Sequence, residues 1–184
     1  RTNAVFFDNV FVHDDYRVGD LNKGFQYIAE ALDIERFSMF TFSPIRGRME
    51  LLCDYVKTAK RDGKPLKDDP VIRQKIAQLT TELEVARVLG VRFVDAALNS
   101  TKTPTVEASH YKLYATELSR RIADTTMDIV GPGAQLALRT EDAPLKGRSE
   151  SCYTYTVIDT IGGGSSEVQR NIIATRGLGL PRNF

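Results

Sequence analysis

The stretch best suited to chemistry is residues 161–173, which read IGGGSSEVQRNII. The three consecutive glycines, Gly162 to Gly164, lack a Cβ, so the backbone there can adopt positive φ and approach a ligand closely. Ser165 or Ser166 can then cap a helix that carries apolar residues on one side. The free N–H groups and positive dipole end of such a helix suit a phosphate, a flavin edge or a polarised carbonyl. The stretch is therefore predicted to be a backbone-donor site, with a plain capped loop as the alternative.

A carboxylate on an apolar helix face is the second candidate. From Lys23 onward the apolar residues recur with helical spacing, and their stripe consists of Phe25, Ile28, Leu32, Met39 and Phe42. Glu35 fills the vacant position of this stripe. An ionised carboxylate on such a face is costly unless it is paired or held protonated. Two interpretations stay open: a structural ion pair with Arg36 or another cation, and a catalytic base.

The remaining elements are those of a helical domain. Residues 3–12 are rich in Val and Phe and predict a strand or two short strands. The Ser43-Pro44 pair is expected to kink or end the first helix. Further helices are predicted to begin at Asp69-Pro70, to span about 105–130 up to Gly131-Pro132-Gly133, and to cover 149–161. The predicted fold class is mainly α: an antiparallel four-helix-bundle domain with a short N-terminal β segment.

Composition excludes several classes of function. With 25 Lys+Arg against 24 Asp+Glu the formal net charge is +1, which favours neither nucleic acid nor an anionic membrane as partner. No apolar run reaches about 18 residues and no signal-peptide pattern is present, so we expect no membrane span. Cys53 and Cys152 lack metal-type spacing, which predicts a reduced, cytoplasmic chain without a metal site. The first residue is Arg1 rather than Met, and we expect the chain to be part of a longer protein.

The order VFFDNVFV, GDLNKGF, LDIER and IGGGSSEVQRNIIATRGLGLPR closely resembles the acyl-CoA dehydrogenase family over residues 2–182. The resemblance implies that residues 1–19 are the remnant of a middle β-domain and that residues 20–184 are the C-terminal helical bundle domain. It also implies FAD-dependent oxidation of an acyl-CoA thioester to the trans-2-enoyl-CoA. A carboxylate removes the α-proton, and the β-hydride goes to the flavin. The implied partners are electron-transfer flavoprotein as electron acceptor and further subunits in a homo- or hetero-tetramer.

The resemblance also assigns the catalytic base. Many family members carry a glutamate two residues before the Thr/Ser-Ser pair of the closing motif, where this chain has Gly163. The isovaleryl-CoA dehydrogenase branch instead places its glutamate on the long helix, in the LD-x-E-R frame that ends here in Glu35-Arg36. The resemblance therefore implies Glu35 as the base and the N–H of Gly163 as a donor to the thioester oxygen. Gly162 replaces a frequent tyrosine, which implies a wide acyl pocket for a bulky or branched group.

The implied FAD contacts come from two glycine-containing loops. Ser165 matches the family's hydroxyl contact to the flavin, and Glu167 stands where a glutamine is common. Gly131 and Gly133 correspond to a loop that approaches the adenosine end of a neighbouring subunit's FAD.

One family motif is altered. The usual Arg-x-x-Phe-Gly sequence, anchored on Gly63, has Ala59 for Arg and Asp62 for Phe. A negatively charged aspartate repels the pyrophosphate of FAD. The altered motif therefore suggests a mixed tetramer in which unlike subunits share FAD sites. The alternatives to a catalytic subunit are a non-catalytic partner or isolated helical module of the same family, and a flavoprotein oxidase or monooxygenase.

Overall fold

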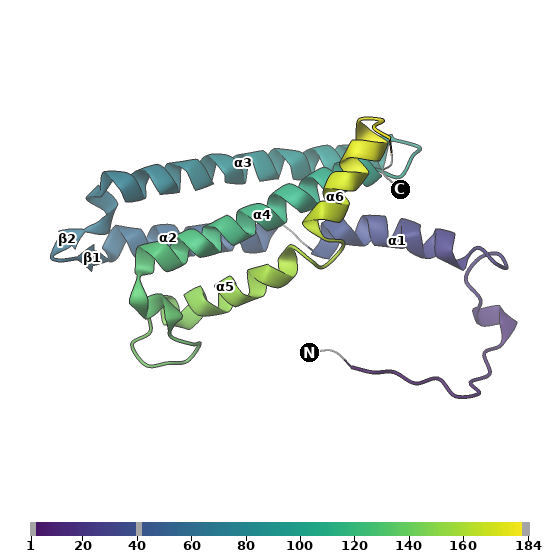
Figure 1. The fold of residues 1–184 in the computed structure, drawn as a ribbon, viewed down its shortest axis with the longest axis horizontal. Helices are drawn as coiled ribbons and strands as arrows, with labels where there is room; N and C mark the ends of the chain where they lie inside the picture. Colours follow the sequence, from purple (N-terminus) through teal and green to yellow (C-terminus); the bar gives the residue numbers. More distant parts are fainter. Residues whose placement is uncertain (1–2, 40–41, 182–184) are drawn as a thin grey trace.

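The computed structural model of the chain describes residues 3–39 and 42–181. Figure 1 shows a bundle of long helices from which α1 and the N-terminal segment extend to one side. The helices are α1 (Gly24–Met39), α2 (Phe42–Thr58), α3 (Pro70–Asn99), α4 (Thr105–Val130), α5 (Arg148–Asp159) and α6 (Ser166–Ile172). The α4 helix is the central element, because it contacts each of the other five. The expected fold class, a mainly α helical bundle, is confirmed.

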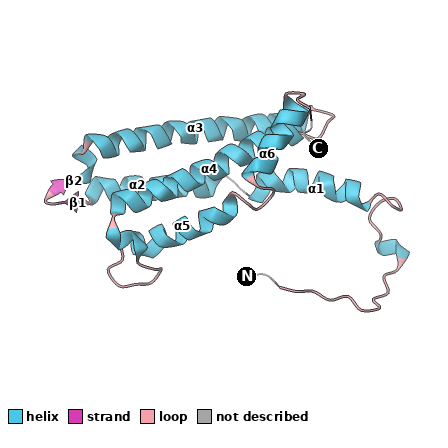
Figure 2. Ribbon diagram, in the orientation of Figure 1, coloured by secondary structure: helices cyan, strands magenta, loops and turns pink. Residues whose placement is uncertain are grey.

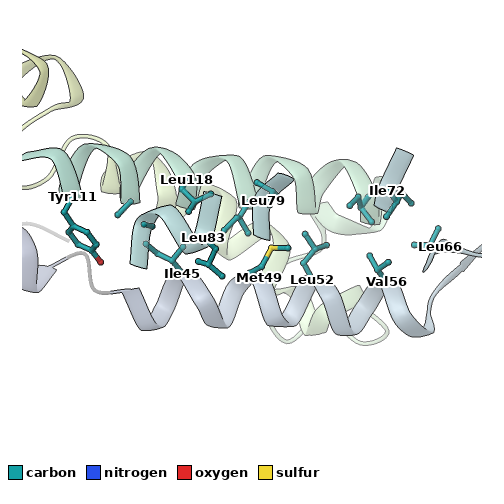
Figure 3. Packing of buried hydrophobic residues seen from close by; sticks show 14 residues of the cluster. Ile45, Met49, Leu52, Val56, Leu66, Ile72, Leu79, Leu83, Tyr111 and Leu118 are labelled. Atoms are coloured by element: carbon teal, nitrogen blue, oxygen red, sulfur yellow. The ribbon is translucent and has the colours of Figure 1, made fainter. Parts of the chain in front are cut away.

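The hydrophobic core lies between α2, α3 and α4, as Figure 3 shows. Its residues recur at spacings of three, four or seven positions, which places them on one face of each helix. The α2 helix contributes Ile45, Met49, Leu52 and Val56; α3 contributes Ile72, Leu79, Leu83 and Ala86; and α4 contributes Tyr111, Ala115, Leu118, Ile122 and Ile129. Burial of these apolar faces stabilises the bundle.

Local sequence signals set the helix ends. Asp69 caps α3, because its carboxylate accepts hydrogen bonds from the N–H groups of Val71 at 2.8 Å and Ile72 at 3.2 Å. Gly131 ends α4 with a φ of 77°, and its N–H bonds to the carbonyl of Met127. Both boundaries agree with the sequence prediction.

A short β-hairpin with a two-residue turn connects α2 to α3. Its strands are β1 (Lys60–Arg61) and β2 (Lys64–Pro65), the only strands in the described part of the chain. The two turn residues, Asp62 and Gly63, both have positive φ, at 51° and 77°. This conformation matches the twist of a tight hairpin.

The predicted N-terminal strands are not formed. Residues 3–13 contain no strand, and a 3-10 turn, Asp14–Tyr16, follows them. Their apolar side chains point into solvent; Phe6 is 89% exposed and Phe11 85%. A strand needs a neighbouring strand for its backbone hydrogen bonds, and among residues 3–39 and 42–181 only β1 and β2 pair. The Val- and Phe-rich composition of residues 3–12 therefore indicates a preference for the β conformation, but composition cannot show whether a neighbouring strand is present.

Two described helices cover the first predicted helix: α1, described as far as Met39, and α2, described from Phe42. Pro44 lies within α2, which continues to Thr58, so the helix does not end at the Ser43-Pro44 pair as expected. The predicted stripe of α1 is exposed: Phe25 by 86%, Ile28 by 53% and Leu32 by 44%. The side chains of Arg36 and Met39, both invoked by the sequence analysis, lie outside the described part.

Two further expectations concern membrane-spanning helices and the cysteines. Within the described ranges, none of the helices combines the length and apolar character needed to cross a membrane. Cys53 and Cys152 are half-buried free thiols, and burial raises the pKa of Cys53.

Candidate functional site: the glycine turn and its supports

The glycine stretch forms a tight turn between α5 and α6. The N–H of Gly162 bonds to the carbonyl of Ile158 at 2.8 Å, and the N–H of Ser166 bonds back to the carbonyl of Thr160 at 3.1 Å. Gly163 and Gly164 have φ of 64° and 93°, a region that side chains disfavour. The predicted positive φ of the glycine stretch is therefore found at these two positions.

Two buried side chains hold the turn from the inside. The ammonium of Lys112, on α4, donates to the carbonyl of Gly164 at 2.7 Å. The amide Nε2 of Gln169, on α6, donates to the carbonyl of Gly163 at 3.0 Å and to that of Gly164 at 3.3 Å. Lys112 and Gln169 are both 0% exposed. We call these two side chains the carbonyl clamp.

The clamp leaves the opposite side of the turn with open donors. A peptide's C=O and N–H point in opposite directions, so the clamped carbonyls of Gly163 and Gly164 direct the N–H groups of Gly164 and Ser165 away from the clamp. Among the residues that the structure describes, the N–H groups of Gly163, Gly164 and Ser165 have no hydrogen-bond acceptor. An unpaired, half-buried set of backbone donors is suited to an anion or a polarised carbonyl.

Ser165 caps α6, as one of the two predicted alternatives. Its Oγ accepts the N–H of Val168 at 3.4 Å. The neighbouring Glu167 is fully exposed, and its pKa is lowered by hydrogen bonds from its own N–H and from the Ser165 hydroxyl, with smaller contributions from the charges of Arg170 and Lys112. The outer rim of the turn therefore carries a negative charge beside its donors.

The second glycine loop follows α4. A Cβ on Gly131 would meet no atom within 4 Å, so its backbone is open to a ligand. A Cβ on Gly133 would lie 3.0 Å from Cγ of Pro144, which gives this glycine a packing role. Both were predicted to contact FAD; the open backbone of Gly131 suits such a contact, and the packing of Gly133 explains its small size without one.

The hairpin that replaces the altered family motif lies against the same end of α4. Arg61 donates from Nη2 to the carbonyl of Ile129 at 2.6 Å, which satisfies one of the last carbonyls of α4. Beside it is a groove of about 480 Å³ whose charged lining consists of Asp62, Asp68 and Asp69 together with Arg61 and Lys64. The one guanidinium on this hairpin is thus engaged within the chain, and carboxylates line the adjacent groove.

Glu35 is exposed on α1. The expected burial of its carboxylate is therefore not found in this chain, and the neighbouring apolar stripe is exposed as well. The α1 helix packs on α4, the same helix that supplies Lys112 to the glycine turn (Figure 1). One helix therefore supports both predicted halves of the site, while the roles of Glu35 and of the Gly163 N–H stay predictions.

A polar cluster anchors the end of α5 just before the glycine turn. The guanidinium of Arg48 hydrogen-bonds to Ser119 and lies 3.4 Å from the carboxylate of Asp159, which also accepts the Ser119 hydroxyl at 3.3 Å. The side chains of Arg48 and Asp159 are only 17% and 8% exposed. This cluster joins α2, α4 and α5.

Sequence reasoning did not identify the carbonyl clamp or this polar cluster. Lys112 offered a signal, because it shares the buried face of α4 with Ala108 and Ala115 at helical spacing, and a lysine there needs a partner. Gln169 and Asp159 offered none, since their partners are remote in sequence.

These features define the class of protein: a helical-bundle domain in which a buried cation on the central helix holds a glycine turn with outward backbone donors. Residues 22–178 match the family described as acyl-CoA dehydrogenase, C-terminal domain. The chain belongs to the acyl-CoA dehydrogenase family, which confirms the resemblance seen in the sequence.

Known relatives agree with this membership. The chain is 29% identical to acyl-CoA dehydrogenase FadE26 of Mycobacterium tuberculosis and 33% identical to acyl-CoA dehydrogenase IpdE1 of the same organism, each over 98% of its length. It spans 46% and 44% of those two relatives. Among solved structures, the Tcur3481–Tcur3483 steroid ACAD is 27% identical with a TM-score of 0.79, over 90% of this chain and 42% of that one. The ChsE4–ChsE5 complex of Mycobacterium tuberculosis is 30% identical with a TM-score of 0.69, over 78% and 36%.

Proposed function

We propose that the protein to which this chain belongs is an FAD-dependent acyl-CoA dehydrogenase that converts an acyl-CoA thioester to the trans-2-enoyl-CoA. The observation that carries the proposal is the glycine turn, whose outward N–H groups have no acceptor in the described chain. Family membership supports the same chemistry. We also propose that residues 1–19 belong to the middle β-domain of that protein and residues 20–184 to its C-terminal domain.

In this proposal the chain's own residues act on the thioester. The N–H of Gly163 donates to the thioester oxygen and stabilises the enolate-like charge that develops there. Glu35 removes the α-proton, whose acidity increases as that oxygen is polarised. Because Glu35 and the apolar stripe of α1 are exposed here, we propose that parts of the family fold beyond this chain cover α1 and exclude water from the base.

The residues fit the cofactor at one end better than at the other. FAD, when bound, accepts the hydride from the β-carbon. Ser165, with Glu167 beside it, would contact the flavin. Gly131, whose backbone is open, would contact the adenosine end of a neighbouring subunit's FAD together with Gly133. The hairpin suits a pyrophosphate less well, because Arg61 donates to a carbonyl of α4 and three aspartates outnumber Arg61 and Lys64 in the groove beside it.

The poor fit of the hairpin to the FAD pyrophosphate favours an enzyme assembled from unlike subunits. Two solved structures similar to this chain each carry the names of two different components, ChsE4–ChsE5 and Tcur3481–Tcur3483. We propose a tetramer in which a different subunit supplies the cationic contact to the FAD pyrophosphate, with electron-transfer flavoprotein as the electron acceptor. A non-catalytic role for this chain within such a tetramer is the second candidate, and the acidic groove at the hairpin is the observation that favours it.

The deciding experiment is acyl-CoA-dependent bleaching of the flavin in the complete protein, expressed with any partner subunit. Glu35→Gln should retain the visible flavin spectrum but lose bleaching by about a thousandfold, because a neutral amide cannot accept the α-proton. Glu30→Gln, which changes an exposed glutamate on the same helix, is the matched control and should bleach normally. Bleaching by Glu35→Gln within tenfold of the unmodified protein would refute the assignment of the base.

A further inference from the structure

The buried ammonium of Lys112 needs an explanation that the proposed reaction does not yet give. Lysine is among the residues least often fully buried, because its charge loses hydration in the interior. Lys112 is nevertheless 0% exposed, and its ammonium bonds to a backbone carbonyl of the glycine turn at 2.7 Å. The carbonyl belongs to Gly164, next to the position that aligns with the catalytic glutamate of many family members.

The contact places a positive charge behind the donors of the turn. The Gly164 carbonyl and the Ser165 N–H belong to one peptide group, so a cation on the oxygen polarises the N–H on the other side. Gln169 does the same, without a charge, for the peptide that joins Gly163 to Gly164. Both donors made stronger in this way lie on the outward side of the turn, beside the N–H of Gly163.

The clamp also fixes the shape of the turn. A Cβ on Gly164 would lie 2.6 Å from Nε2 of Gln169, so only glycine lets the amide reach the two carbonyls. The positive φ values of Gly163 and Gly164 are thus maintained by hydrogen bonds from two different helices, α4 and α6. Loss of either side chain would free the peptides to rotate.

We infer that Lys112 is a positioning residue of the proposed reaction: its buried ammonium, held on the Gly164 carbonyl, fixes the glycine turn that presents the Gly163 N–H to the thioester oxygen, and it polarises the neighbouring Ser165 N–H. The inference rests on the proposed function and adds a residue to it. Lys112 touches neither substrate nor cofactor in this scheme. It acts on the negative charge that develops on the thioester oxygen, so its effect is larger in the transition state than in the bound substrate.

The test uses the complete, FAD-loaded protein with any partner subunit. Lys112→Met removes the charge and the N–H donors and keeps an unbranched side chain that is one heavy atom shorter. Lys75→Met, on α3, is the matched control, because Lys75 is an exposed lysine whose ammonium pairs with Asp128. Lys112→Arg restores a cation and should recover part of the loss.

We expect Lys112→Met to lower kcat for flavin bleaching by about 10- to 100-fold, less than the loss of a direct oxyanion donor, with KM within about threefold. Two readouts report on the turn itself. Hydrogen exchange should accelerate in residues 160–169 and stay unchanged in the rest of the bundle. The infrared carbonyl stretch of a bound 13C-labelled enoyl-CoA thioester should shift to lower frequency in the unmodified protein and less in Lys112→Met.

The results distinguish failure of the inference about Lys112 from failure of the proposed function. If the unmodified protein bleaches but Lys112→Met keeps kcat within twofold, or if exchange accelerates equally throughout the bundle, the inference is wrong and the proposed function stands. If the unmodified protein binds FAD but no acyl-CoA bleaches it, the proposed function fails and takes the inference with it. Should Lys112→Met not fold, Gln169→Leu removes the other half of the clamp and must show the same selective loss of kcat; normal kcat in that variant refutes the inference.

Discussion

Replacing Asp159 by alanine should destabilise the protein more than any exposed charge removal. The carboxylate lies 3.4 Å from the guanidinium of Arg48 and accepts the Ser119 hydroxyl at 3.3 Å, with only 8% of its side chain exposed. Removal leaves a cation that is 17% exposed with Ser119 as its remaining partner in this cluster. Breaking a buried ion pair in this way costs about 3 to 5 kcal/mol, and the residual hydration of Arg48 places the expected loss near the lower value, about 3 kcal/mol.

The measurement is thermal unfolding of the purified protein followed by circular dichroism. For a chain of this size a loss of about 3 kcal/mol lowers Tm by about 6 to 12 °C. Asp128→Ala is the matched control, because the Lys75–Asp128 pair is exposed by 41% and 66% and should contribute less than about 1 kcal/mol. The reasoning is refuted if the two alanine variants melt within about 2 °C of each other.

Three further predictions concern the core, the turn and the hairpin. Burial raises the pKa of Tyr111 to about 12 from 10.0, so both states keep the proton below pH 10 and only the unfolded chain loses it between pH 10 and about pH 12. The Tyr111 contribution to the free energy of unfolding should therefore fall by about 2 kcal/mol across that window. Urea unfolding should show a fall smaller by about that amount in Tyr111→Phe and an unchanged fall in Tyr155→Phe; an unchanged fall in Tyr111→Phe would contradict the assignment. Gly164→Ala, at a φ of 93°, should cost about 1 to 3 kcal/mol in the same assay, and a variant as stable as the parent would show that the turn tolerates a side chain. Arg61→Ala removes the 2.6 Å bond to the end of α4, so amide exchange in residues 59–66 should accelerate and stability should fall by about 1 kcal/mol, whereas unchanged exchange would mean that the hairpin is held by other contacts.

The sequence by itself determined what is local. Asp69 at the start of α3, Gly131 at the end of α4 and Ser165 at the start of α6 each act within four residues of themselves, so residue type and spacing sufficed to place them. The positive φ of the glycine turn followed for the same reason. Family membership was also readable from the order of the motifs.

Tertiary structure alone decided which side chains support the turn. Lys112 reaches Gly164 across 52 residues and Arg48 reaches Asp159 across 111, and helical periodicity carries no information about which distant face it will meet. The same limit explains α1 and residues 3–13: an apolar stripe shows which face can be buried, but its exposure depends on what packs against it. Although α1 packs on α4, its predicted stripe and the apolar side chains of residues 3–13 stay exposed in the ranges that the structure describes.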